Sequence, residues 1–319
     1  MSRLFIRNGR VVDPSQGIDQ GMDLLIEDGV VAELAERLEP PKRARTLDAA
    51  ELVVAPGFID LHAHLREPGA EHKETIATGL RAAVAGGFTS VCCFPDTKPV
   101  NDDPSVTRFI RERGAQEGLA RLYALGALSV GQRGEELAEI GELVREGVVA
   151  ISDDPHPVRN PLLMRRALEY SRSFGMTIVS HPQDPDLSDG GCMHEGEMAT
   201  RIGLHGIPAA AESVAVARDI ALAGLTMGRL HFALLSTRDA LEPVRQARQQ
   251  GIKVTCEVAA HHLAMSDRDV ATANYDPNWK VAPPLRSPDD VEAVHQALYD
   301  GTVDAIVSDH SPHHPDDKE

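Results

Sequence analysis

The chain has 319 residues, of which 42% are hydrophobic and 4% aromatic, and its 49 acidic and 32 basic residues give a formal net charge of −17. This length accommodates one large α/β domain with a small addition. The negative charge excludes a general nucleic-acid or membrane-surface binder, because such proteins present a positive field.

The cysteine pattern and the apolar runs indicate the compartment. The four cysteines include no C-x-x-C pair, and the chain is far longer than a disulfide-stapled scaffold. Free thiols of this kind are typical of a reducing environment. No apolar run reaches the ~18 residues of a membrane span, and the N-terminus has no signal-peptide core. We therefore expect a cytoplasmic protein.

The first 52 residues read as short β-hairpins. Residues 4–13, LFIRNGRVVD, carry the turn pair Asn8-Gly9, and residues 23–34, DLLIEDGVVAEL, carry Asp28-Gly29. Asn-Gly and Asp-Gly favour two-residue hairpin turns, because these residues adopt positive φ readily. We expect a small N-terminal β appendage over residues 1–52.

After this appendage, apolar strand-like runs alternate with helix-like stretches eight times. The strand candidates are LVVAPGFIDLHAH, FTSVCCFP, ARLYALGAL, VVAIS, MTIVS, RLHFALLS, IKVTCEV and VDAIVSDH. The helix candidates include residues 104–117, 135–147, 160–174, 209–224, 238–250 and 288–300. Continuous apolar strands separated by helices predict a parallel sheet covered by helices, and eight units favour a closed barrel. The predicted fold is an α/β chain with a (β/α)8 TIM-type barrel over residues 53–319.

The predicted barrel ends at its eighth strand. That strand runs straight into SDHSPHHPDDKE, and no eighth helix follows. The N-terminal hairpins also lack later strands that would complete their sheet. We expect the sequence to be a C-terminally truncated part of a longer one.

Residues 57–69, GFIDLHAHLREPG, place His62 and His64 two apart at the end of the first barrel strand. Side chains two apart point to the same face of a strand, so both imidazoles face the same way, with Arg66 just beyond. Two adjacent imidazoles form a common metal half-site.

Polar residues also follow the other predicted strands, and in (β/α)8 barrels the chemistry lies at these C-terminal strand ends. They are Asp96, Asp153, Asp154, His181, Ser236, His261, His262, Asp309, His310 and His313. Histidines and carboxylates thus recur at one rim of the barrel, which predicts a metal centre there.

Six stretches of the chain resemble the class I dihydroorotases, which are cyclic amidohydrolases of the amidohydrolase superfamily. They are APGFIDLHAHLREPG, AGGFTSVCCFPDTKPVND, SDDPHPV, VTCEV, APPLRS and SDHSPHH. This resemblance implies a reversible hydrolysis of dihydroorotate to N-carbamoyl aspartate in pyrimidine biosynthesis. Related hydantoinases and allantoinases bridge two metals with a carbamylated lysine near strand four, but VVAISDDPHPV contains no lysine.

The resemblance also implies a role for each matching residue. His62, His64, Asp154 and Asp309 would hold one divalent metal ion, Zn²⁺ by preference, and His181 would belong to a second metal position or its surroundings. Arg66, Asp96 and His313 would hold the substrate carboxylate.

Elementary chemistry agrees with these roles. A ring amide is a poor electrophile, and zinc can polarise its carbonyl and lower the pKa of a water to ~7. A carboxylate such as Asp309 can move the proton of that water to the leaving nitrogen. The planar guanidinium of Arg66 matches a carboxylate.

Three departures from the family pattern are present, and one of them is that Pro155 follows the Asp pair and Pro182-Gln183 follows His181. The other two concern residues that would bind metal or substrate. A metal-binding histidine of the sixth strand is replaced by Leu234, which cannot bind a metal, and His231, three residues earlier, has the parity of a side chain that faces the helices. Asp96 stands where the family has asparagine. An ionised Asp96 would repel a substrate carboxylate by about 4 kcal/mol at ~4 Å and an effective dielectric of ~20, unless it pairs with Arg66.

These departures leave two alternatives beside the dihydroorotase-type enzyme. One is a weakly active or inactive scaffold subunit for aspartate transcarbamoylase, and the other is a hydrolase of a different cyclic amide. The expected partners are a small-molecule substrate and a second copy of the chain or a transcarbamoylase, with no nucleic acid and no membrane.

Overall fold

The computed structural model describes residues 2–318, and they form two compact units that divide between Phe58 and Ile59. The expected boundary after residue 52 assigns Val53 and Val54 to the barrel, whereas this short strand pairs with the first strand of the N-terminal unit. In the described part of the chain, no helix is long and apolar enough to cross a membrane.

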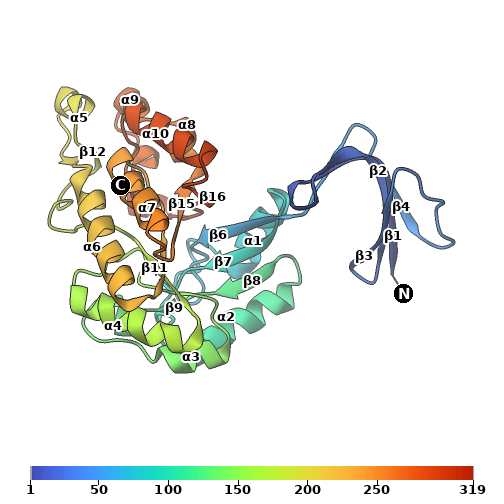
Figure 1. Ribbon diagram of the computed structural model, residues 1–319, viewed down its shortest axis with the longest axis horizontal. Helices are drawn as coiled ribbons and strands as arrows, with labels where there is room; N and C mark the ends of the chain where they lie inside the picture. The colour runs from blue at the N-terminus through green and yellow to red at the C-terminus, as the bar shows by residue number, and fades with distance from the viewer. Residues whose placement is uncertain (1, 319) are drawn as a thin grey trace. The chain divides into compact units, whose positions relative to one another are not determined.

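The N-terminal unit is a five-stranded sheet in the order β3-β2-β1-β4, with β5 also paired to β1 (Figure 1). Its strands are β1 (Arg3–Asp13), β2 (Ile18–Glu27), β3 (Val30–Ala35), β4 (Arg45–Asp48) and β5 (Val53–Val54). Ile6, Leu24 and Ala49 form its small core.

Only one of the two predicted hairpin turns is present. Asp28 and Gly29 join β2 to β3 with φ angles of 48° and 83°, which confirms that turn. Asn8 and Gly9 instead lie inside the continuous strand β1, where the register against β2 shifts. Asn8 has a φ of 63°, and its N–H donates to Asp23 Oδ1 at 2.9 Å. The positive φ that we read as a turn therefore forms a bulge.

The larger unit contains the eight predicted barrel strands. They are β6 (Phe58–Ala63), β7 (Phe88–Cys93), the continuous pair β8 (Arg121–Ala124) and β9 (Gly126–Ala127), β10 (Ile151–Ser152), β11 (Thr177–Ser180), β14 (Arg229–Phe232), β15 (Val254–Ala259) and β16 (Ala305–Val307). A separate short pair, β12 (Met193–His194) and β13 (Gly206–Ile207), lies in the connection after β11.

The pairing of these strands runs around a ring. One sheet has the order β6-β7-β8 and another the order β16-β15-β14-β11-β10-β9. They join at one side because β8 and β9 belong to one segment, and at the other because Ala63 bridges His310 in parallel, with His64 N–H donating to His310 O at 2.8 Å. The predicted (β/α)8 architecture is confirmed.

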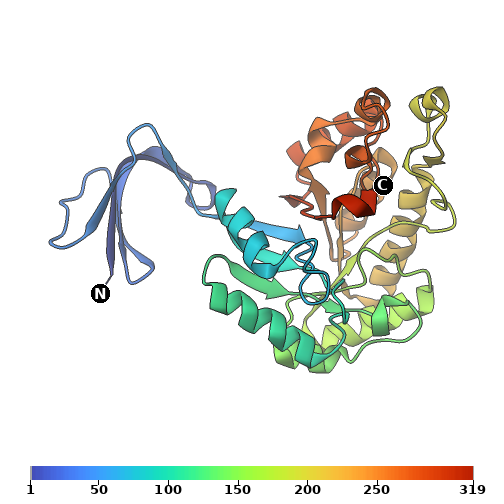
Figure 2. The same ribbon diagram turned by 180° about the vertical axis from the view of Figure 1, so that it is seen from behind.

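Helices surround the strands, and the six predicted helices are present (Figures 1 and 2). The helices are α1 (Ile76–Ala85), α2 (Pro104–Glu117), α3 (Ile140–Glu146), α4 (Pro161–Ser171), α5 (Glu197–Ile202), α6 (Ala210–Thr226), α7 (Arg238–Gln249), α8 (Ala260–Ala264), α9 (Asp267–Thr272) and α10 (Pro288–Tyr299). Three begin with a capping residue followed by proline, namely Asp103-Pro104, Asn160-Pro161 and Ser287-Pro288. Such a pair bonds a free N–H of the first turn and presets the helical φ.

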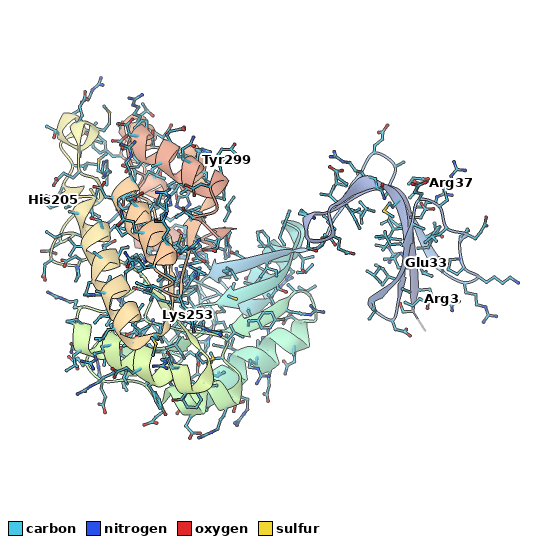
Figure 3. All side chains as sticks on the ribbon, viewed as in Figure 1. Arg3, Glu33, Arg37, His205, Lys253 and Tyr299 are labelled. Atoms are coloured by element: carbon cyan, nitrogen blue, oxygen red, sulfur yellow. The ribbon has the colours of Figure 1, made fainter. Side chains whose placement is uncertain are left out.

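Two of the hydrophobic clusters in the larger unit hold the strand ends in place. The larger cluster lies between helices and strands and includes Leu143, Met164, Leu168 and Val244. The other, which we call the interior layer, consists of Phe94, Leu125, Val179, Ala233, Leu234, Ala259 and Val307. On the outside of the unit, His205 and Tyr299 are exposed (Figure 3).

Candidate metal centre

His62 and His64 lie at the end of β6 and are buried, with 0% and 4% of their surface exposed. Their ring centroids are 5.3 Å apart, and His62 stacks on Phe94 with centroids 4.1 Å apart. Phe94 belongs to the interior layer, so the apolar interior of the barrel supports the histidine pair from one side. The predicted shared face of the two imidazoles is therefore observed.

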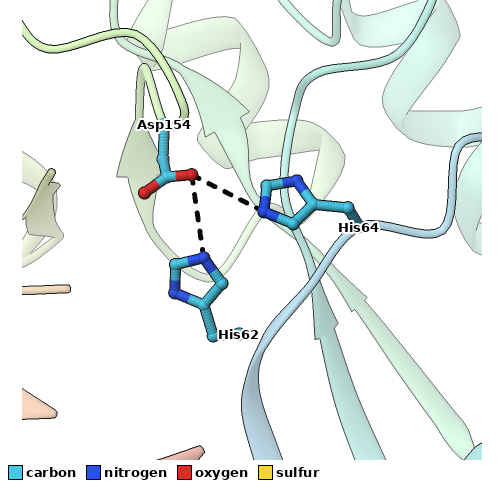
Figure 4. Close-up of side chains that lie close together, drawn as sticks. All are labelled: His62, His64 and Asp154. Carbon is cyan, nitrogen blue, oxygen red and sulfur yellow. Dashed lines mark ion pairs between the residues drawn. The ribbon is translucent and has the colours of Figure 1, made fainter. Parts of the chain in front are cut away.

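Asp154, just after β10, faces both imidazoles (Figure 4). Its Oδ1 lies 3.7 Å from His62 Nε2 and 3.6 Å from His64 Nε2. Burial alone would raise the pKa of Asp154 and lower that of His62. Their mutual attraction outweighs burial, so the pKa of Asp154 is well below and that of His62 well above the ordinary value.

Two further predicted residues approach this group. Asp309, after β16, has its Oδ1 3.9 Å from His62 Nε2, and burial raises the pKa of Asp309 to about 6. His181, after β11, has its Nδ1 3.1 Å from Asp154 Oδ2. The His62, His64, Asp154, His181 and Asp309 side chains thus come from four strand ends and meet at one place.

The donor atoms of this group fit a divalent metal ion. His62, His64 and Asp154 can each offer one ligand atom within 4.8 Å of the others. Among the described residues, His62 Nε2 is buried and has no hydrogen-bond partner. Asp154 Oδ2 and His181 Nδ1 are also buried without a hydrogen bond, although they face each other as an ion pair at 3.1 Å. Tetrahedral zinc ligands lie ~3.3 Å from one another, close to the 3.7 Å and 3.6 Å that separate Asp154 Oδ1 from His62 Nε2 and His64 Nε2. Because unpartnered buried polar atoms are costly, their convergence indicates a ligand-binding position.

Arg66 lies beside this group, but much of its guanidinium is already bonded within the chain. Its Nη1 donates to Asp96 Oδ2 at 2.6 Å, its Nη2 to Ser311 Oγ at 2.7 Å and its Nε to Pro312 O at 3.1 Å. Three of about five N–H donors are therefore committed, which leaves two for a ligand. The His313 side chain is 46% exposed, and burial, then the positive charges of Arg66 and Lys73, lower its pKa.

Three non-glycine residues around the site have left-handed backbone conformations. The φ angles are 65° for Arg66 and 53° for both Leu234 and Asp309. Each such conformation costs on the order of 1–3 kcal/mol and persists where the surroundings hold it. The strand ends at the site are therefore bent away from regular strand geometry.

Comparison with known proteins places the chain in a family. Residues 51–240 match the Dihydro-orotase-like family. The chain belongs to this family. It is 57% identical over 310 residues to the dihydroorotase of Anaeromyxobacter dehalogenans (strain 2CP-C), a match that covers 97% of this chain and 72% of that protein. It is 51% identical over 316 residues to the dihydroorotase of Geobacter metallireducens, covering 99% and 74% of the two chains.

Solved structures share the fold of this dihydroorotase-like chain. L-hydantoinase (dihydropyrimidinase) from Arthrobacter aurescens superposes with a TM-score of 0.86 at 23% identity, covering 100% of this chain and 71% of that one. Dihydropyrimidinase from Brevibacillus agri NCHU1002 gives a TM-score of 0.79 at 23% identity, covering 98% and 69%.

The parity prediction for His231 is wrong. We expected this dihydroorotase-like chain to direct His231 toward the helices, but its Nε2 lies 3.1 Å from Glu257 Oε2, inside the barrel. Leu234 also points inward, since it is part of the interior layer and only 2% exposed. Both residues face inward because β14 ends at Phe232 and the positive φ of Leu234 breaks the strand alternation.

Sequence reasoning missed Glu257, which is 1% exposed and bonds the ring of His62 at 2.7 Å. Its pKa is about 2, because hydrogen bonds from His231 and His62 outweigh the opposite effect of burial. One signal was available: Glu257 is an acidic residue within the apolar strand run IKVTCEV. Buried acidic residues are almost always paired, so an acidic residue in this apolar run indicates a polar or charged partner inside the barrel.

Proposed function

We propose that the protein is a dihydroorotase, which hydrolyses the ring amide of dihydroorotate to N-carbamoyl aspartate and catalyses the reverse ring closure. One observation carries this proposal. The side chains of His62, His64 and Asp154 bring possible metal-ligand atoms together in a buried position, and two of these atoms, His62 Nε2 and Asp154 Oδ2, have no hydrogen-bond partner. Membership of the Dihydro-orotase-like family and relatives named dihydroorotase support the substrate.

Within this proposal, His62, His64, Asp154 and Asp309 hold one divalent ion, and His181 stands at its edge. Imidazole together with carboxylate favours zinc. Leu234 leaves a second ion short of a ligand, so we propose one ion per chain. When bound, such an ion supplies Lewis-acid polarisation of the ring carbonyl and a more acidic water.

The residues of the chain then position the substrate and move a proton. The two remaining N–H groups of Arg66, together with His313, hold the substrate carboxylate, while Asp96 holds Arg66 in place. An Asp309 oxygen accepts a proton as water adds to the ring carbonyl carbon. The same oxygen returns this proton to the ring nitrogen as the C–N bond breaks, which gives a neutral leaving group.

The two alternatives have less support. An inactive scaffold would not need unpartnered donor atoms buried at one place. A hydrolase of an uncharged cyclic amide would explain an unpaired Asp96, but Asp96 is paired with Arg66 at 2.6 Å.

A homodimer or an aspartate transcarbamoylase complex stays a prediction. A cytoplasmic location is part of the proposal, because Cys92, Cys93, Cys192 and Cys256 are free thiols.

Steady-state hydrolysis tests the proposal with dihydroorotate, hydantoin and dihydrouracil as parallel substrates, since the last two lack the carboxylate. We expect zinc-loaded protein to hydrolyse dihydroorotate by far the fastest. Asp309→Asn should lower kcat by about 10²–10⁴-fold, the range for loss of a general base. Absent turnover of dihydroorotate together with turnover of hydantoin would replace this function with the alternative cyclic-amide hydrolase.

A further inference from the structure

The two histidines of the metal centre make matching contacts through their second ring nitrogens. His62 Nδ1 lies 2.7 Å from Glu257 Oε1, and His64 Nδ1 lies 2.8 Å from Asp96 Oδ1. The carboxylates come from different strands, Glu257 from β15 and Asp96 from the end of β7. Both are largely buried, with side chains 1% and 10% exposed.

Each carboxylate is held by a second partner on its other oxygen. His231 Nε2 lies 3.1 Å from Glu257 Oε2, and Arg66 Nη1 donates to Asp96 Oδ2 at 2.6 Å. His231 is itself fixed, because its Nδ1 lies 2.8 Å from Thr255 Oγ1. Neither carboxylate can rotate without losing a bond, so both have a fixed orientation toward their histidine.

This arrangement determines which nitrogen each imidazole presents to a ligand. An ionised carboxylate only accepts hydrogen bonds, so Nδ1 must carry the hydrogen in both rings. The lone pair of a neutral ring is then on Nε2, and both Nε2 atoms lie within 3.7 Å of Asp154 Oδ1. Hydrogen-bonded carboxylates behind metal-binding histidines fix the ring and increase its basicity.

We propose that Asp96 and Glu257 are a matched pair of positioning residues, each of which fixes one histidine of the metal pair so that Nε2 faces the ion. The inference rests on the metal centre of the proposed function. It gives Asp96 a second role besides holding Arg66 for the substrate carboxylate. One oxygen of Asp96 contacts Arg66, and the other contacts the metal-binding His64. An asparagine there could offer His64 either its oxygen or its NH₂ group, and would fix the ring less firmly.

The test measures the zinc affinity of the whole chain by competition with a chromophoric chelator. The variants are Asp96→Asn and Glu257→Gln, which preserve size and remove the charge. We expect zinc affinity to fall about 10–100-fold in each, the range for removal of a partner behind a metal ligand. The thermal stability of the metal-free proteins, measured in parallel, reports any general damage to the fold.

Glu212→Gln is the matched control. Glu212 is also a buried carboxylate, 2% exposed, but it accepts hydrogen bonds from Ser236, Thr237 and Arg286. Its loss should lower thermal stability and leave zinc affinity within about threefold of the parent, well below the 10–100-fold loss expected above. If Glu257→Gln does not fold, Asp96→Asn, whose side chain is less buried, decides the question.

The outcomes separate this inference from the proposed function. Zinc affinities of Asp96→Asn and Glu257→Gln within about threefold of the parent would overturn the positioning roles, because they fall short of the 10–100-fold effect. Zinc binding that fails in the parent chain would overturn the metal centre and the inference with it. Tight zinc binding without dihydroorotate turnover, with both variants weakened, would overturn the substrate and support the inference.

Discussion

Asp96 and Arg66 form a direct ion pair, with Asp96 Oδ2 accepting from Arg66 Nη1 at 2.6 Å. The pairing lowers the pKa of Asp96 although burial opposes it, with His64 contributing more than Arg66. The repulsion that the sequence predicted between Asp96 and a substrate carboxylate is therefore offset by a neighbouring positive charge. Arg66 keeps two free N–H donors beside this ion pair, so it is the residue expected to contact a substrate carboxylate.

Arg66→Ala should raise the KM for dihydroorotate by about 10–100-fold, since a hydrogen bond to a charged group contributes about 1.5–3 kcal/mol. At saturating zinc the change in kcat should be small, because the contact exists in the ground state and the transition state alike. Steady-state kinetics with dihydroorotate and with uncharged hydantoin check this, with hydantoin as the internal control. An equal rise in KM for both substrates would contradict a carboxylate contact.

Leu234→His should allow a second metal ion. Leu234 is inward-facing and close in sequence to the strand end, so a histidine there adds a donor that the interior layer now lacks. Without metal, the new polar group should destabilise the fold by about 1–3 kcal/mol, because the site is apolar. Elemental analysis and metal-free unfolding check both effects. A variant with unchanged metal content would contradict our account of Leu234.

The pH dependence of folding should report on His262. This residue is 2% exposed, its Nε2 lies 3.1 Å from Pro283 O, and burial lowers its pKa to about 3, helped by the His261 and Arg286 charges. The unfolded chain, with the ordinary pKa of 6.5, binds more protons between these values. Stability is therefore fully present above pH 6.5 and falls as the pH drops, by about 1.4 kcal/mol per unit.

His262→Gln removes this titration and keeps an N–H donor for the proline carbonyls. Urea unfolding of both proteins between about pH 7 and pH 5 measures the difference in their free energies of unfolding. The free energy of unfolding of the parent should fall more steeply with decreasing pH than that of the variant. Parallel curves for parent and variant would show that His262 keeps an ordinary pKa in the folded protein.

The strand-end pattern predicted which side chains lie together at the candidate metal centre. His62, His64, Asp154 and Asp309 meet because parallel strands bring their C-terminal ends to one rim, a constraint that a sequence displays directly. The contacts of His62 with Glu257, and of Glu257 with His231, could not be predicted from the strand-end pattern. His231 was misassigned because the positive φ of Leu234 ends the strand alternation on which parity depends.

Two other features also depend on segments that are distant in sequence, which a local sequence pattern does not reveal. Asn8-Gly9 was read as a turn, but its sequence predicts only a positive φ, which a bulge in a continuous strand also uses. The partner strand, which lies beyond the next turn, decides between the two. Glu257 was likewise missed, because its partners His62 and His231 lie far from it in sequence. Pairing between distant segments is what the local pattern does not contain.

Zinc titration of the metal-free protein, followed by dihydroorotate hydrolysis at each step, tests the central claim most directly. We predict that activity rises with added zinc and saturates near one ion per chain, as expected for a three- or four-ligand site with one open position. His62→Ala should bind zinc weakly and remain inactive at the same loading. Absent turnover at every zinc level, or activity that appears only as a second ion binds, would contradict the account.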